Sequence, residues 1–114
     1  MKVEHYSFGR IRIDGKEYTS DVIVGSGYLR DGWWRKEGHR VQLEDVASIL
    51  DLDFEVIIFG TGANGRVRVD DEVVRAFKER GKEVIVAMTG EAVKVYNELL
   101  KKNRKVILAA HLTC

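Results

Sequence analysis

The segment Gly60-Thr61-Gly62-Ala63-Asn64-Gly65 follows an unbroken apolar run and has the pattern G-x-G-x-x-G. Glycines at this spacing after a strand let a pyrophosphate approach the backbone, provided that a helix begins inside the motif. The next helix signal comes only at Asp70, after a short stretch, residues 66–69, that alternates like a strand. The acidic residues that follow Asp70 would also repel a phosphate. The sequence therefore favours a tight exit from a strand over a dinucleotide site.

A weaker anion site is predicted where two parallel strands would end. Ligands of open α/β sheets bind in the crevice outside the carboxyl ends of such strands. Free N–H groups after Thr89 and the side chain of Arg66 could bind a carboxylate or phosphate there. The competing interpretation, which the sequence favours, is that Thr89 only caps its helix. The candidate residues of this site are Gly60, Thr61, Gly62, Arg66, Thr89 and Gly90.

The histidines and the one cysteine suggest no metal site. His5, His39 and His111 lack metal-ligand spacing, and Cys114 belongs to no cysteine cluster, so we expect neither a metal nor a cofactor. An imidazole can activate a nearby thiol, and His111 and Cys114 lie close in sequence. Residues three apart in an extended strand point to opposite faces, however. The sequence therefore names no catalytic residue and favours a protein that is not an enzyme.

Two adjacent tryptophans give the most suggestive surface feature. Trp33, Trp34 and Arg35 lie in a polar stretch that runs from residue 31 to residue 40. Trp and Arg are the residue types that most often carry the binding energy of protein interfaces. If the stretch is extended, one tryptophan faces the core and the other faces outward. We therefore predict a protein-contact surface from Trp33 to His39.

Size and composition indicate one domain, residues 1–114. Hydrophobic residues make up 45% of the 114-residue chain and charged residues 32%, which is enough apolar material for one core. The net charge of +1 gives no reason to expect nucleic acid or an anionic membrane as a partner. No apolar run resembles a signal peptide or approaches the roughly 20 residues that span a bilayer. A single cysteine predicts a reducing compartment, so we expect a cytoplasmic protein.

The N-terminal half reads as a hairpin and a helix. Strands over residues 6–13 and 18–24 flank Asp14-Gly15, a strong signal for a tight hairpin turn. Gly25-Ser26-Gly27 is expected to end the second strand. Apolar residues at helical spacing predict a helix over residues 42–52.

The C-terminal half alternates strands and helices. Apolar runs predict buried strands over residues 56–59, 84–88 and 106–110. Helices are expected after Asp70 and after Thr89, ended by Gly81 and Asn103. Strands joined by helices pair in parallel through right-handed crossovers. We predict a three-layer α/β domain with a mixed central sheet, in which an N-terminal β-hairpin precedes βαβαβ and supplies the antiparallel part.

The C-terminal sequence also resembles a known family. The segment Glu91-Ala92-Val93-Lys94-Val95-Tyr96-Asn97 and the closing His111-Leu112-Thr113-Cys114 are similar to small proteins related to the adipogenesis-associated protein. That family includes an assembly factor of mitochondrial respiratory complex I. The resemblance extends upstream through Trp34-Arg35, Gly38-His39 and Gly60-Thr61-Gly62. It implies a compact three-layer α/β fold and no known reaction.

Two hypotheses for function follow from the sequence. The leading one is a non-catalytic binding or assembly module that uses the Trp33–His39 loop to contact a protein partner, with a homodimer as one arrangement. The alternative is a small-anion or metabolite-binding enzyme or sensor that uses the crevice at Thr61, Gly62, Thr89 and Gly90. A mutation of either tryptophan would test the first, and a ligand-dependent rise in melting temperature would test the second.

Overall fold

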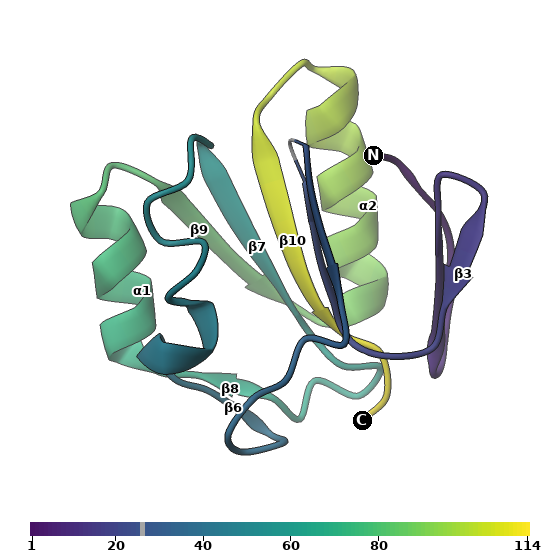
Figure 1. Ribbon diagram of the computed structural model, residues 1–114, viewed down its shortest axis with the longest axis horizontal. Coiled ribbons are helices and arrows are strands. Elements are labelled where there is room, and N and C mark those ends of the chain that lie inside the picture. The colour runs from purple at the N-terminus through teal and green to yellow at the C-terminus, as the bar shows by residue number, and fades with distance from the viewer. Residues whose placement is uncertain (26) are drawn as a thin grey trace.

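A five-stranded mixed sheet forms the centre of the computed structural model, which describes residues 1–25 and 27–114 (Figure 1). The strand order is β5-β4-β10-β7-β9, in which β10, β7 and β9 are parallel and β4 and β5 are antiparallel additions. Every residue of β7 and of β10 is buried, so the predicted central strand is confirmed. The strands are β4 (Val22–Gly25), β5 (Tyr28–Asp31), β7 (Val56–Thr61), β9 (Glu83–Ala87) and β10 (Val106–His111).

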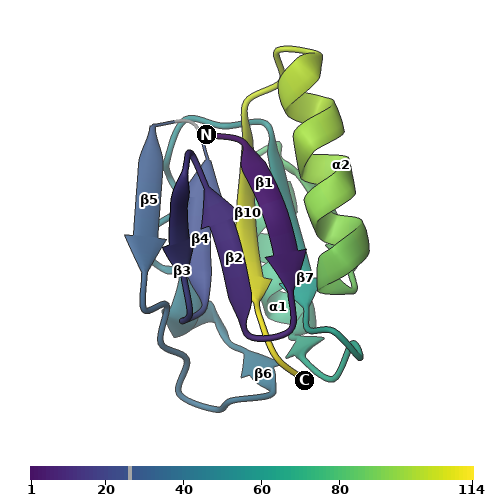
Figure 2. The same cartoon turned by 90° about the vertical axis from the view of Figure 1, so that its right-hand side faces the viewer.

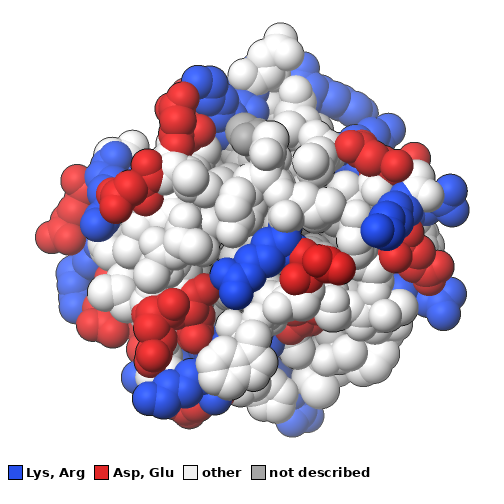
Figure 3. All heavy atoms as spheres, viewed as in Figure 1, with Lys and Arg blue, Asp and Glu red and all other residues white. Residues whose placement is uncertain are grey.

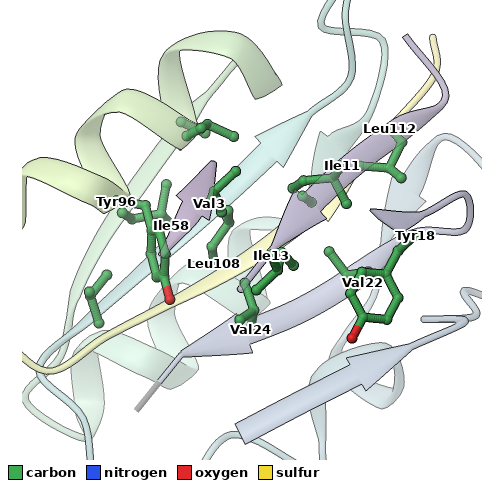
Figure 4. Close-up of a cluster of buried hydrophobic side chains, with 14 of the residues drawn as sticks. Val3, Ile11, Ile13, Tyr18, Val22, Val24, Ile58, Tyr96, Leu108 and Leu112 are labelled. Atoms are coloured by element: carbon green, nitrogen blue, oxygen red, sulfur yellow. The ribbon is translucent and has the colours of Figure 1, made fainter. Parts of the chain in front are cut away.

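A helix and a small second sheet together cover one face of the central sheet (Figure 2). Side chains from the small sheet, the helix and the central strands meet in one apolar cluster, which includes Val3, Ile11, Tyr96 and Leu108 (Figure 4). The Tyr96 hydroxyl donates to the Met1 carbonyl, which ties the N-terminus to the helix. These elements are β1 (Val3–Ser7), β2 (Arg10–Ile13), β3 (Lys16–Tyr18) and α2 (Thr89–Lys101).

The opposite face is covered by a second helix and by irregular chain. Phe77 of the helix packs against Phe54 and Phe59, and Trp33 belongs to the same apolar cluster. Two short parallel strands close the lower end of this layer, and one of them lies within the extended stretch predicted at residues 66–69. The elements are α1 (Asp71–Glu79), the 3₁₀ helix η1 (Leu43–Val46), β6 (Arg40–Val41) and β8 (Arg68–Val69).

The hairpin prediction is half right. The turn at Asp14-Gly15 is present, with positive φ angles of 47° and 82°, and it joins β2 to β3. The hairpin does not supply the antiparallel part of the central sheet, however, because it belongs to the separate small sheet and ends at Tyr18. The antiparallel strands are β4 and β5. β4 is buried on both faces, as an interior strand must be, and the predicted break at Ser26 lies outside the described residues.

The prediction of a helix over residues 42–52 is wrong. Only η1 forms there, and turns follow it. The Asp45 carboxylate accepts hydrogen bonds from the Gln42 and Lys36 N–H groups, which fixes a tight turn. The Leu50 and Leu52 carbonyls accept hydrogen bonds from the Lys82 ammonium group. Tertiary contacts therefore override the helical spacing of the apolar residues.

The βαβαβ prediction for the C-terminal half is confirmed. α1 and α2 lie on opposite faces of the sheet, and Gly81 and Asn103 follow them with φ angles of 77° and 58°. Asp70 stands at the cap position of α1, but its carboxylate pairs with Arg40 instead of capping the helix. Within residues 1–25 and 27–114, neither helix has the length and apolar content that a bilayer crossing requires.

Candidate functional site

A polar cluster lies where β10 ends, and it joins three residues that are far apart in sequence. Asp21 precedes β4, Arg35 lies in the loop after β5, and His111 is the last residue of β10. One Asp21 oxygen, Oδ2, lies 2.7 Å from His111 Nδ1 and 2.9 Å from Arg35 Nη1. The other oxygen accepts the Leu112 N–H at 2.8 Å. Arg35 and His111 are buried, so this carboxylate is the local counter-charge of a guanidinium group removed from water.

Nδ1 of His111 lies beside two groups that need opposite partners. The ionised Asp21 carboxylate, 2.7 Å away, can only accept, whereas Nη2 of Arg35, 3.0 Å away, can only donate. In the neutral tautomer in which Nδ1 donates to Asp21, Nε2 is an acceptor, and the Thr113 hydroxyl lies 3.2 Å from it. Carboxylate, imidazole and hydroxyl then follow the order that orients and activates a nucleophile in acyl-transfer enzymes.

The pKa of Asp21 lies below its ordinary value. Burial alone would raise the pKa of this carboxyl, because desolvation disfavours the charged form. Hydrogen bonds from His111, from the Leu112 N–H and from Arg35 favour the charged form and outweigh the burial. Asp21 is therefore ionised at neutral pH.

The loop from Trp33 to His39 is anchored by buried side chains on both sides of one exposed tryptophan. Trp33 is 4% exposed, and its indole N–H donates to the Asp45 carbonyl at 2.9 Å. Arg35 is 8% exposed, lies 4.7 Å from the Trp33 ring and donates to the Gly38 carbonyl. Trp34, between them, is 72% exposed. The predicted alternation of the two tryptophans is therefore confirmed, and His39 is exposed at the end of the loop.

The predicted anion residues do come together, but they bind one another. The Thr89 hydroxyl accepts the Gly62 N–H and donates to the His111 carbonyl, and the Thr61 hydroxyl donates to the Ala87 carbonyl. The preference for Thr89 as a helix cap is therefore wrong, because its hydroxyl joins three strand ends and Met88 stands at the cap position. Gly60 fits closely against Thr89, where a Cβ would meet the hydroxyl oxygen.

The remaining N–H groups of the glycine-rich loop bind residues 113 and 114. The Ala63 N–H donates to the Thr113 carbonyl at 2.6 Å, and the Asn64 and Arg66 N–H groups donate to the Cys114 oxygen. Main-chain oxygens of the chain itself therefore occupy donors that an anion at this loop would need. The Arg66 side chain and Gly90 are exposed at the edge of this region.

Sequence reasoning missed Asp21, which organises the polar cluster. It singles out the partner Arg35 only as a surface residue, and His111 only as an imidazole close in sequence to the Cys114 thiol. The available signal was the position of Asp21, a charged residue directly before the apolar run Val22-Ile23-Val24 that forms an interior strand. The identity of its partners, 14 and 90 positions away, could not be derived from spacing.

The mixed sheet, its two crossover helices on opposite faces and the added antiparallel sheet define a three-layer α/β domain that solved structures share. Residues 3–111 match the family described as protein of unknown function (DUF498/DUF598), and the chain belongs to this family. It is similar to the conserved hypothetical protein PH1505 from Pyrococcus horikoshii OT3, with 30% identity, full coverage of both chains and a TM-score of 0.85.

Two further structures resemble this chain. The structure named MT938 is 25% identical, with 99% of this chain and 98% of that one covered and a TM-score of 0.79. A Bordetella pertussis protein described as a Mth938-like domain is 19% identical over 97% of this chain and 85% of that one, with a TM-score of 0.77. At that identity the Bordetella protein is evidence for the fold alone.

Proposed function

We propose that this protein is a non-catalytic binding module whose contact residue is Trp34. The single observation that supports it is the 72% exposure of Trp34 between two anchored neighbours, Trp33 and Arg35. A large exposed aromatic side chain on a fixed loop is the residue type and setting that dominates protein interfaces. The partner is another protein chain, and the proposal keeps the cytoplasmic location predicted from the single cysteine.

The anchoring of the loop is what makes Trp34 suited to binding. Ordering a free loop at an interface costs free energy that reduces affinity. Here Trp33, Arg35 and the Lys36 N–H are all held by internal hydrogen bonds before any partner arrives. The face of the molecule in Figure 3 carries interspersed acidic and basic side chains, which suits a protein partner of mixed charge.

The experiment compares Trp34→Ala with Phe8→Ala, a matched control at an aromatic residue that is 63% exposed on the small sheet. Proteins that the wild-type chain captures are quantified on the immobilised variants, and sedimentation velocity follows self-association. We expect Trp34→Ala to weaken binding at least tenfold, which is about 1.4 kcal/mol, with an unchanged circular dichroism spectrum. Equal binding by wild type, Trp34→Ala and Phe8→Ala would contradict the proposal.

The resemblance to the adipogenesis-associated protein and to an assembly factor of respiratory complex I supports a binding or assembly role. The resemblance implies no known reaction, and the members of that family include unassigned domains as well as assembly or regulatory proteins. The role in complex I is not carried over to this chain. Only the general role of binding other proteins is carried over.

A second candidate is a small-anion or metabolite-binding enzyme or sensor at Thr61, Gly62, Thr89 and Gly90. The observation in its favour is the series Asp21, His111 and Thr113 beside Gly62. In this series the Thr113 hydroxyl lies 3.2 Å from Nε2 of His111. A ligand there would displace the main chain of residues 113 and 114. A rise in melting temperature with phosphate, carboxylates or nucleotides that is lost in His111→Ala would support this candidate.

A further inference from the structure

β9 is an open edge of the central sheet and carries no charge along its length after Glu83. It pairs only with β7, so one side of the strand has no neighbour in the described chain. The residues of β9 after Glu83 are all apolar, and the side chain of Val86 is 50% exposed. The other edge strand, β5, carries Arg30 and Asp31, which is the usual protection of an edge against pairing. β9 lacks that protection.

The main-chain groups on the open side of β9 form a short, defined set. In a parallel strand, every second residue forms its backbone hydrogen bonds with the same neighbouring strand. In β9, Glu83 is directed toward β7, because its N–H donates to the carbonyl of Glu55, the residue before β7. Val84 and Val86 therefore direct their N–H and C=O groups outward. Beyond these two residues, the Lys82 N–H donates to the Phe77 carbonyl, and the Met88 carbonyl accepts from the Ala92 N–H. These two groups are therefore not free to pair with an added strand.

We propose that β9 pairs antiparallel with β9 of a second copy of this chain, about a two-fold axis at Ile85. In that register Val84 of one copy lies opposite Val86 of the other, and each pair exchanges both of its outward hydrogen bonds. The Lys82 carbonyl faces the Met88 N–H of the copy, and neither group is hydrogen-bonded within residues 1–25 and 27–114. In a shifted register, groups that are already hydrogen-bonded, such as the Lys82 N–H or the Met88 carbonyl, would lie opposite groups that need a partner. The donors and acceptors of this edge are thus complementary to themselves.

The test measures the oligomeric state of the full chain by sedimentation velocity over a range of concentrations. We expect a dimer for wild type and a monomer for Val86→Lys, because a lysine on an open edge blocks pairing. The control Leu29→Lys places the same charge on β5, at a residue that is 36% exposed, and should remain a dimer. Trp34→Ala should also remain a dimer, since this inference does not depend on the proposed function.

A wild-type chain that is monomeric at every concentration would overturn the inference. So would a dimer that is lost in Trp34→Ala or Leu29→Lys and kept in Val86→Lys.

Discussion

Asp21 is the residue on which the functional loop depends. Its two oxygens bind Arg35, His111 and the Leu112 N–H, so one carboxylate joins the loop after β5 to the end of β10. Arg35 in turn fixes the backbone beside Trp34. The exposed tryptophan is therefore positioned by a carboxylate that it never touches.

Replacement of this carboxylate should destabilise the protein. Asp21→Asn keeps an acceptor for the Leu112 N–H but leaves the buried Arg35 without a counter-charge, so we expect a loss of about 2 kcal/mol in the free energy of unfolding. Urea denaturation measures it, and Asp31→Asn at an exposed carboxylate is the control. A loss no larger than that of the control would mean that Arg35 is held by its other contacts.

The same residue predicts a dependence of stability on pH. The Asp21 pKa is lower in the folded protein than in the unfolded chain, so the folded state favours the ionised form. Its contribution is present above the ordinary Asp pKa of about 3.9 and is lost as the pH falls through the lower, folded pKa. The stability of Asp21→Asn should therefore fall less steeply than that of wild type in this acidic range, which urea denaturation at several pH values would show.

At the scale of elements, Gly62 fixes how the strand β7 passes into the loop that holds residues 113 and 114. Its φ of 106° is a conformation that other residues rarely adopt, and a Cβ would collide with the Cys114 backbone. Gly62→Ala should cost about 3 kcal/mol, more than the roughly 1 kcal/mol expected for Gly81→Ala, where φ is also positive but no atom is near. Thermal unfolding of both variants tests this difference.

The elements also show which sequence signals were reliable. Unbroken apolar runs predicted the positions of β7, β9 and β10. β7 and β10 are interior strands buried on both faces, as predicted, but β9 is an edge strand whose residues are partly buried or exposed, so the expected burial of residues 84–88 is wrong. The helix over residues 42–52 failed because the segment folds into successive turns with i→i+3 hydrogen bonds, from the Ile49 N–H to the Val46 carbonyl and from the Leu52 N–H to the Ile49 carbonyl. The sequence predicts a strand break at Gly25-Ser26-Gly27. Within the described residues β4 ends at Gly25, where a Cβ would collide with Val106 and Ile107, and Gly27 lies in a turn. Periodicity detects burial and cannot detect such distant contacts.

For the whole molecule, the layers were predictable and the pairing of the antiparallel strands was not. The alternation of strands and helices after Val56 determined the parallel part. Asp14-Gly15 fixed a turn correctly, but a turn does not say which sheet its strands join. β4 pairs with β10, more than 80 positions away, and nothing local in either segment indicates that partnership.

A chain cut after Arg104 should therefore fail to fold. Such a fragment keeps α1, α2 and four strands of the central sheet but leaves β4 and β7 without the strand that lies between them. We expect no cooperative thermal transition from it, and recovery of one when a peptide of residues 105–114 is added. Circular dichroism measures both, and a scrambled peptide of the same composition is the control. A cooperative transition of the fragment alone would contradict this prediction.

The middle strand of the sheet follows its four companions in the chain, so a ribosome makes it after them. Until residues 106–111 have left the exit tunnel, the nascent chain exposes two apolar strands that cannot yet close on each other. The nascent chain is therefore least protected just before β10 emerges, and chaperones that bind extended apolar segments would act on it at that stage.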